Sequence, residues 1–212
     1  SALRGSVAPT SIRAKALTSA ASMAVTSGDN VAGRMMAGEA LELHRTFRDP
    51  SSTATVLHIL GLAAGNEDDF AGAKPLFEES ARLCREVGDR HGAMNADRSL
   101  AWMHSGLGDR ERARALHESN LLQSRELGDE LMESMSLIAL AMLAIDDGSL
   151  DVARSMLQAS LRIDRDQRYL PSIAFNLCRF ARLHAIEGSE WTATTFLASA
   201  DTLLEEIGAR PS

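Results

Sequence analysis

The chain has 212 residues, of which 45% are hydrophobic and 4% aromatic, and its formal net charge is −7. A nucleic-acid-binding protein usually carries a basic patch or stripe. None stands out here, so we do not expect this chain itself to bind nucleic acid. The longest apolar run, 137–145, is far shorter than the roughly 20 residues that a membrane-spanning helix needs. A signal peptide, with its charged and apolar regions in order, is not apparent either.

A forty-residue period organises the chain. Short turns recur at 28–29, 68–69, 108–109, 148–149 and 188–189, and a second set recurs at 48–49, 88–89, 128–129, 168–169 and 208–209. Between successive turns, apolar residues follow a helical spacing, as in Leu57, Leu60 and Ala64, and then Ala73 and Phe77. Self-similarity at a period of about 20–50 residues indicates a solenoid or array of helical units.

In chain order, we expect residues 1–11 to be a lead-in and residues 12–212 to be one superhelical domain. Its repeats are predicted at 12–49, 50–89, 90–129, 130–169 and 170–209. The pattern predicts ten helices in pairs, at 12–27 and 30–47, 51–66 and 70–87, 90–107 and 110–127, 130–147 and 150–167, and 170–187 and 190–207. The chain starts without Met and ends at 211–212 without a clear boundary, so we expect it to be a segment of a longer protein.

The residues at the turns explain where the helices of a pair separate. Glycine at positions 28, 108, 148 and 188 can adopt the left-handed conformation that ends a helix. The next residue (Asp29, Asp109, Ser149 or Ser189) is expected to cap the following helix by accepting from its free N–H groups.

Two prolines modify this pattern. Pro75 falls beyond the first turn of the helix at 70–87, where it removes a hydrogen bond and crowds the carbonyl of residue 71. With Gly72 nearby, we expect this helix to start late or to kink. Pro171 falls where a first-turn proline is tolerated, and 168–170 replaces the Gly-Asp turn, so the last junction is expected to differ in angle.

These residues resemble the tetratricopeptide repeat (TPR), whose pattern has large apolar residues and a Gly in the first helix, a Gly-Asp turn, and Ala, an aromatic residue and Ala in the second. The best match is the repeat with Leu57, Gly61, Asp69, Ala73 and Phe77. The usual repeat is about 34 residues, and each unit here is longer. The resemblance implies an all-α, right-handed α-solenoid of five TPR-like helix-turn-helix repeats.

The longer variant is similar to the arrays of large bacterial regulators, the LuxR-like and maltose-activator-like signal-transduction ATPases. The stretches that carry this resemblance are 76–80, 85–89, 125–129 and 196–209. The resemblance implies a sensor or interaction segment of such a regulator. The ATPase itself is not expected here, because a Gly-rich phosphate loop with Lys-Ser/Thr is missing from the sequence.

We find no active site in the sequence and expect neither a cofactor nor a metal. His104 and His184 occupy the same repeat position, which leaves a metal or catalytic pair as an alternative, but packed core histidines are the commoner interpretation. Cys84 and Cys178 lie more than two repeats apart, too far for the Cα separation of about 7 Å that a disulfide tolerates. Two free thiols favour a reducing cytoplasm.

The better candidate site is a surface. In TPR arrays the first helix of each pair lines a concave groove, and the resemblance places the following residues there: His58, Leu62, Asn95, Arg98, Trp102, Met135, Ile138, Met142, Ile145, Phe175, Cys178 and Arg182. The middle of this groove is apolar and rich in Met, which adapts to varied partners. Arg98 and Arg182 could pair with a carboxylate of a ligand. Alternatively, these residues are ordinary core, or a second copy of the chain covers them.

We therefore expect a cytoplasmic, non-enzymatic array that binds a protein or peptide segment, or a small effector, in its groove. It is expected to belong to a larger bacterial transcriptional regulator or signalling ATPase, and a homodimer is left open. The alternative is a free-standing scaffold or adaptor that holds the tail of a protein partner.

Overall fold

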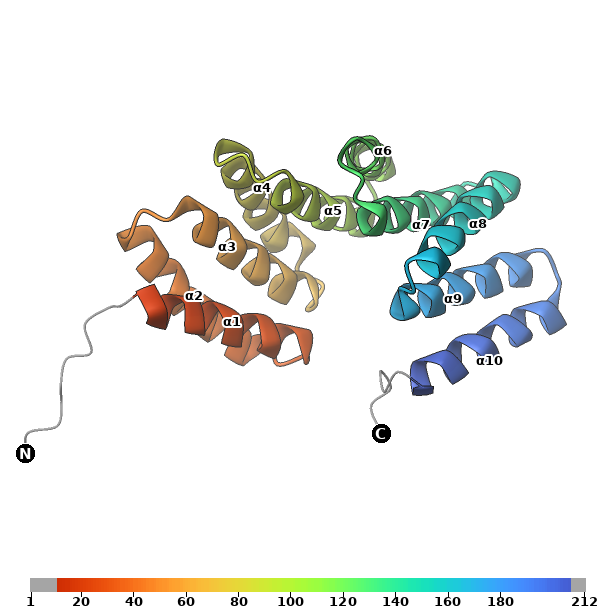
Figure 1. Cartoon of the computed structure of the whole chain (residues 1–212), viewed down its shortest axis with the longest axis horizontal. Coiled ribbons are helices and arrows are strands. Elements are labelled where there is room, and N and C mark those ends of the chain that lie inside the picture. The colour runs from red at the N-terminus through yellow and green to blue at the C-terminus, as the bar shows by residue number, and fades with distance from the viewer. Residues whose placement is uncertain (1–10, 207–212) are drawn as a thin grey trace, which may run out of the picture. The chain divides into compact units, whose positions relative to one another are not determined.

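The computed structural model describes residues 11–206. This part of the chain forms ten α-helices and no strand (Figure 1): α1 (Ser11–Thr26), α2 (Asn30–Thr46), α3 (Pro50–Gly65), α4 (Phe70–Glu86), α5 (Arg90–Gly106), α6 (Arg110–Leu127), α7 (Glu130–Asp146), α8 (Leu150–Asp166), α9 (Leu170–Ile186) and α10 (Glu190–Glu206). The predicted helix starts and ends differ from these by at most one residue. Residues 1–10, Ile207 and the expected turn at 208–209 lie outside the described residues.

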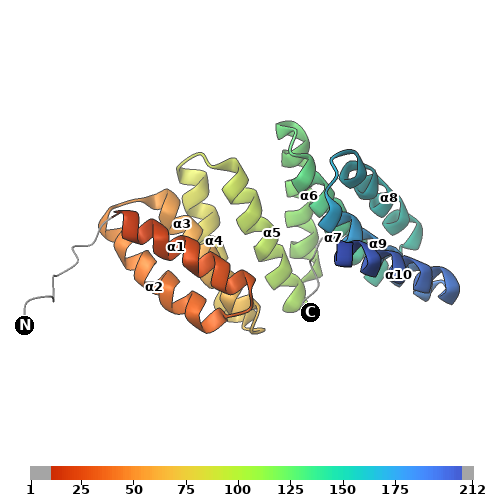
Figure 2. The ribbon, with the colours of Figure 1, turned by 60° about the horizontal axis from the view of Figure 1, so that its bottom comes forward.

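The chain divides into two compact units, Ser1–Ala113 and Arg114–Ser212, and the boundary falls within α6. In the first unit each helix from α1 to α5 packs on the next (Figure 2), and α3 also contacts both α1 and α5. The odd-numbered helices therefore form one layer and α2 and α4 the other. In the second unit α7, α8, α9 and α10 pack in the same succession, and α7 contacts α9. The predicted all-α helical repeat array is confirmed.

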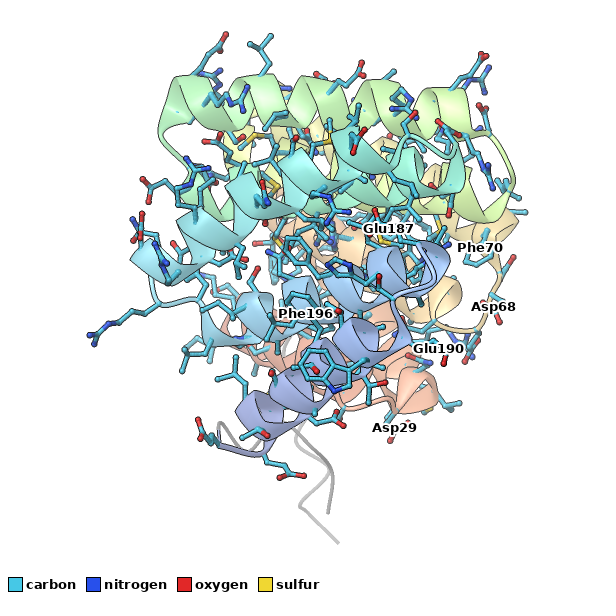
Figure 3. The ribbon with its side chains drawn as sticks, turned by 90° about the vertical axis from the view of Figure 1, so that its right-hand side faces the viewer. Asp29, Asp68, Phe70, Glu187, Glu190 and Phe196 are labelled. Atoms are coloured by element: carbon cyan, nitrogen blue, oxygen red, sulfur yellow. The ribbon has the colours of Figure 1, made fainter. Side chains whose placement is uncertain are left out.

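The turns between the described helices, from α1 to α9, end each of these helices in the same way. After α1 the N–H of Asp29 donates to the carbonyl of Ala24 at 2.8 Å, and after α3 the N–H of Asp69 donates to that of Ala64 at 3.1 Å. The residue before each donor has a positive φ, with Gly28 at 89° and Asp68 at 60°. This is the Schellman arrangement, which uses the last free carbonyls of the helix. Figure 3 labels Asp29 and Asp68 at these two turns.

Aspartate caps the next helix at most of these turns. The side chain of Asp29 accepts from the N–H of Ala32, and that of Asp109 accepts from the N–H of Arg112 at 3.2 Å. The predicted cap at Ser149 was wrong, because its side chain forms no such bond. Its hydroxyl is one bond shorter than a carboxylate, and with ψ at 63° it does not reach the N–H groups of α8.

Pro75 does not delay its helix. We expected α4 to start late, yet it begins at Phe70, where Asp69 accepts from the N–H of Gly72 at 2.9 Å, and Pro75 lies inside it. The φ of proline is close to that of a helix, so the cost is one lost hydrogen bond and some crowding. Burial of Ala73 and Phe77 on the core side of α4 offsets that cost. Pro171 lies in the first turn of α9, as predicted.

Within each unit the core forms where an even-numbered helix meets the next odd-numbered one. Ala37 and Ala63 share one core cluster, Phe77 and Met103 a second, and Leu157 and Leu183 a third, and all six side chains are fully buried. Gly61 lets Phe77 approach α3, since a Cβ at position 61 would lie 2.7 Å from the Phe77 ring. This contact explains the glycine of the repeat pattern.

Beside its apolar cluster, the junction of α7, α8 and α9 also holds a buried polar cluster. The fully buried carboxylate of Asp164 accepts from Ser134, from Ser172 at 2.7 Å and from the Asn176 amide at 2.8 Å. The same amide donates to Ser160 at 2.7 Å. Among the described residues no basic side chain pairs with Asp164. The negative charge is therefore stabilised by hydroxyl and amide donors from both neighbouring helices.

Candidate binding surface

Three residues that the sequence placed in the groove line one pocket of the first unit. His58 and Leu62 come from α3 and Asn95 from α5, and the pocket has a volume of about 550 Å³. Helix α1 supplies a further wall with Thr18, Ser19, Ser22 and Met23, and Ser80 and Cys84 of α4 also line the pocket. Its size falls within the range of about 300–1,000 Å³ that is typical of ligand pockets.

His58 is held as a neutral side chain in the wall of this pocket. Burial, and to a smaller extent the positive charge of Arg98, lower the pKa of His58 to about 4. Its ring meets the ring of Phe77 edge-on with centroids 5.2 Å apart, and its Nε2 lies 3.4 Å from the hydroxyl of Ser99. At neutral pH the imidazole therefore offers one donor and one acceptor without charge.

Arg98 lies beside this wall, one helical turn after Asn95 on α5. Its Nε is buried and has no hydrogen-bond partner. Within residues 11–206 no carboxylate pairs with the guanidinium. Burial lowers the pKa of Arg98, and no nearby negative charge counters that effect. The residue as a whole is half-buried, so its charge is only partly desolvated, and its unpartnered Nε can still donate to an anion supplied from outside.

Trp102 is partly a packing residue. Its side chain is 40% exposed, and its ring meets that of Phe70 at 6.0 Å. The Trp102 ring also covers Gly65, where an added Cβ would come within 3.0 Å of it. One face of the indole thus supports the junction of α3, α4 and α5, and the rest is accessible.

The second unit holds the other predicted groove residues. Met135, Ile138, Met142 and Cys178 are half-buried, and Met142 packs against the core cluster of Leu157 and Leu183. Ile145 is buried in that same core, so its side chain offers no surface.

Phe175 and Arg182 on α9 are both accessible, but Arg182 is already engaged in an ion pair. The Phe175 side chain is 57% exposed. Arg182 already donates to the Asp146 carboxylate at 2.6 Å. The two predicted anion-binding arginines therefore differ, because the charge of Arg182 is neutralised within the chain and that of Arg98 is not.

A pocket of about 470 Å³ between α8 and α9 contains none of the predicted residues. It is lined by Gln158, Leu161, Arg162, Arg165, Ile173 and Leu177. Arg165 lies 3.9 Å from Asp166. The polar side chains of this lining, Gln158, Arg162 and Arg165, are exposed, so the lining offers no buried polar group to a ligand.

His104 and His184, the two histidines of the alternative metal or catalytic pair, each contact neighbouring side chains. His104 is buried with its Nδ1 3.4 Å from an oxygen of Asp109, and His184 lies 3.2 Å from Glu187 and stacks on Phe196. In the described part of the chain no three His, Cys, Asp or Glu side chains are grouped to hold a metal. Cys84 and Cys178 are free, and burial raises the pKa of the Cys84 thiol.

The contribution of α1 to the pocket was not predicted from the sequence. Thr18 and Ser22 occupy the same repeat positions as His58 and Leu62, forty residues earlier. Extending the register to the first repeat would have found them. Their small hydroxyl side chains gave no apolar signal of their own.

The helix pairs, their uniform turns and the glycine contact define a TPR-type helical repeat array. Among solved structures, the chain is similar to BtubC from P. vanneervenii, with a TM-score of 0.73 and 16% identity over 93% of this chain and 82% of that one. It is also similar to a putative kinesin light chain of Podosopora anserina with nearly identical TPR-like repeats, with a TM-score of 0.68 and 16% identity over 93% and 97%.

A third similar structure is the apo form of RapI, with a TM-score of 0.72 and 10% identity over 94% of this chain and 85% of that one. At these identities the similarity concerns the fold. No family model and no curated protein sequence matches the chain. Of the helices in the described part, none combines the length and apolar content needed to cross a membrane.

Proposed function

We propose that the chain is a non-enzymatic binding array, and that its first unit holds a carboxylate-bearing segment of a protein partner in the pocket of α1, α3 and α5. The observation that carries this proposal is the half-buried guanidinium of Arg98 beside the His58 wall, whose buried Nε has no hydrogen-bond partner. An acidic side chain there would make a charge-assisted, two-pronged contact with Arg98. Asn95 and the neutral His58 would supply further hydrogen bonds, and Leu62 apolar contact.

The direct test uses short synthetic peptides that contain glutamate, with matched peptides that contain glutamine instead. We expect the Nε–H NMR signal of Arg98 to shift saturably with a glutamate peptide and not with its glutamine counterpart. Since hydrogen bonds to charged groups contribute about 1.5–3 kcal/mol, Arg98→Met should weaken binding by roughly ten- to a hundredfold. Arg182→Met is the matched control, because Arg182 is already paired with Asp146.

Three results would argue against this site: no saturable shift with any acidic peptide, equal binding of the glutamine peptides, or equal losses in the two arginine variants. The free protein gives a second readout. Arg98→Met removes a half-buried charge that no carboxylate of the described residues compensates, so its melting temperature should be unchanged or higher. A large fall in melting temperature would instead make Arg98 a structural residue.

We further propose that this array is the sensor or interaction segment of a larger bacterial regulator of the LuxR-like or ATPase kind, acting in the cytoplasm. The proposal rests on the sequence resemblance of stretches such as 76–80 and 85–89. Sequencing the reading frame on both sides tests it: a Gly-x-x-x-x-Gly-Lys-Ser/Thr loop or a helix-turn-helix is expected. A start codon just before residue 1 and a stop just after residue 212 would favour the free-standing adaptor instead.

A further inference from the structure

An arginine recurs near the end of the second helix in the first four repeats, at positions 45, 85, 125 and 165. At the first three of these positions the guanidinium pairs with a carboxylate: Arg45 with Glu42 at 3.5 Å, Arg85 with Asp97 at 2.6 Å and Arg125 with Glu133 at 2.8 Å. In the last two pairs the acid belongs to the first helix of the following repeat. The ion pair therefore crosses the groove between two repeats.

At the fourth junction, between α8 and α9, the arginine is present but these acids are not. The positions of Glu42, Glu133 and Asp97 are occupied there by Arg162, Ile173 and Leu177. The carboxylate that pairs with Arg165 is that of its sequence neighbour Asp166, at 3.9 Å, and both side chains are largely exposed. Within residues 11–206 no carboxylate pairs with Arg162. This junction thus has two cations where the others have an arginine and an acid.

The groove at this junction is open and has an apolar floor. Helices α8 and α9 lie side by side (Figure 1), and Leu161, Ile173 and Leu177 line the pocket of about 470 Å³ between them, together with the two arginines. The three apolar side chains are half-buried. At the first two junctions the counterparts of Leu161 and Leu177 are buried: Leu41, Ala81, Leu57 and Asp97. Apolar surface is therefore uncovered at the junction that lacks the acid.

The buried carboxylate of Asp164, which precedes Arg165 in the sequence, does not neutralise these arginines. It accepts from Ser172 and Asn176, and among the described residues it has no basic partner. The described lining of the pocket includes no carboxylate. The rim of the groove is therefore positive, although the whole chain has a net charge of −7.

We propose that this groove is a second binding site, which holds an acidic segment of a protein partner in which a glutamate or aspartate lies beside a large apolar side chain. The partner's carboxylate takes the place that Asp97 and Glu133 have at the other junctions, and accepts from the guanidinium of Arg162 or Arg165. The apolar side chain covers Ile173 and Leu177. Because both arginines are exposed, rising salt should weaken binding.

The test titrates the whole chain with the capped peptide Leu-Glu-Glu-Phe and follows the methyl NMR signals of Leu161 and Leu177. This peptide is expected to shift both signals saturably. Leu-Gln-Gln-Phe should bind more weakly because it lacks the charge, and Gly-Glu-Glu-Gly because it leaves the floor uncovered. Arg162→Gln and Arg165→Gln should each weaken binding of the first peptide by roughly three- to tenfold.

Ile173→Glu tests the same groove without removing an arginine. Its carboxylate recreates the pairing of Arg125 with Glu133, so it should pair with Arg165 and reduce peptide binding at least as much as the arginine variants. Arg125→Gln is the matched control, because Arg125 is already engaged with Glu133, and it should bind like the parent. Arg98→Met should also leave these methyl shifts unchanged, since Arg98 belongs to the first unit.

Any of four results overturns this site: no saturable shift with Leu-Glu-Glu-Phe, equal binding of Leu-Gln-Gln-Phe, equal losses in Arg125→Gln and Arg165→Gln, or full binding by a folded Ile173→Glu. If circular dichroism shows that Ile173→Glu is unfolded, the arginine variants and the glutamine peptide decide. Binding of octanoate in place of the peptides also overturns the proposal, because it would indicate a small lipid-like ligand.

Discussion

At the scale of single residues, a neutral histidine in the pocket wall lies beside a half-buried cation. The imidazole of His58 is kept uncharged by burial and by the neighbouring guanidinium of Arg98. A protonated His58 would place a second positive charge beside an unpaired one. Neutral His58 leaves Arg98 as the cation beside the wall, while Asp89 adds a carboxylate to the pocket lining, and acid should disturb this arrangement.

The pKa of His58 gives a signed expectation for stability. Its value falls from 6.5 in the unfolded chain to about 4 in the folded protein. Between these values the unfolded state binds more protons, so the free energy of unfolding decreases as the pH falls from 6.5 towards 4. By the shift alone, His58 should account for about 3 kcal/mol of that decrease.

Denaturant unfolding of the parent chain and of His58→Gln at pH 7, 6 and 5 measures this contribution. The variant should lose less stability than the parent over this range. His91→Gln serves as the control, because His91 is exposed on α5. Parallel pH profiles for the parent and His58→Gln would show that His58 is not the group responsible.

Residue-level chemistry was only partly predictable from the sequence. The repeat register correctly predicted helix starts and turns. It gave Arg98 and Arg182 equal status, because the ion pair of Arg182 with Asp146 joins α7 and α9 at a spacing that no local pattern encodes. Likewise, the repeat register predicted Ile145 as an apolar groove residue, but its side chain is buried in a core cluster.

At the scale of elements, helix spacing depends on where a side chain is missing. Gly61 touches the buried Phe77 ring, and a Cβ there would lie 2.7 Å away. Gly38 on α2 has no atom within 4 Å of the same added Cβ. Both residues are helical, so the two sites differ mainly in what an added methyl group would meet.

Gly61→Ala and Gly38→Ala should therefore change stability in opposite directions. Overpacking a close-packed core typically costs about 1–3 kcal/mol, which exceeds the gain in helix propensity, so Gly61→Ala should lower the free energy of unfolding. Gly38→Ala should raise it by about 0.5–1 kcal/mol. Thermal or urea unfolding followed by circular dichroism distinguishes them. Equal stabilisation by both changes would mean that Phe77 moves aside freely.

At the scale of the whole molecule, the core is distributed along the chain. Each cluster joins neighbouring helices, and the chain divides into two compact units. Arrays of this kind have a stability that is nearly a sum of repeat and nearest-neighbour terms. Loss of one core cluster should then destabilise the neighbouring helices more than the rest of the chain.

Phe77→Ala and Leu157→Ala form a matched pair for this expectation, since both side chains are fully buried at the same repeat position. Each should cost about 2–5 kcal/mol locally. Hydrogen exchange should show faster exchange chiefly in α3–α5 for the first variant and in α7–α9 for the second. A uniform loss of protection in both units would show that the chain unfolds as one cooperative body.

The buried polar junction of α7, α8 and α9 limits how the repeats can be recombined. A regular period makes the repeats look like exchangeable modules, but Asp164 depends on Ser172 and Asn176 from the repeat that follows. One repeat earlier, those two positions are Met132 and Ser136. A chimera that joined the fourth repeat to a copy of itself would leave the carboxylate facing a thioether, with fewer donors and no route to solvent. The buried hydrogen bonds of Asp164 thus require the fifth repeat to follow the fourth. A duplication of the fourth repeat would need compensating substitutions before it could fold.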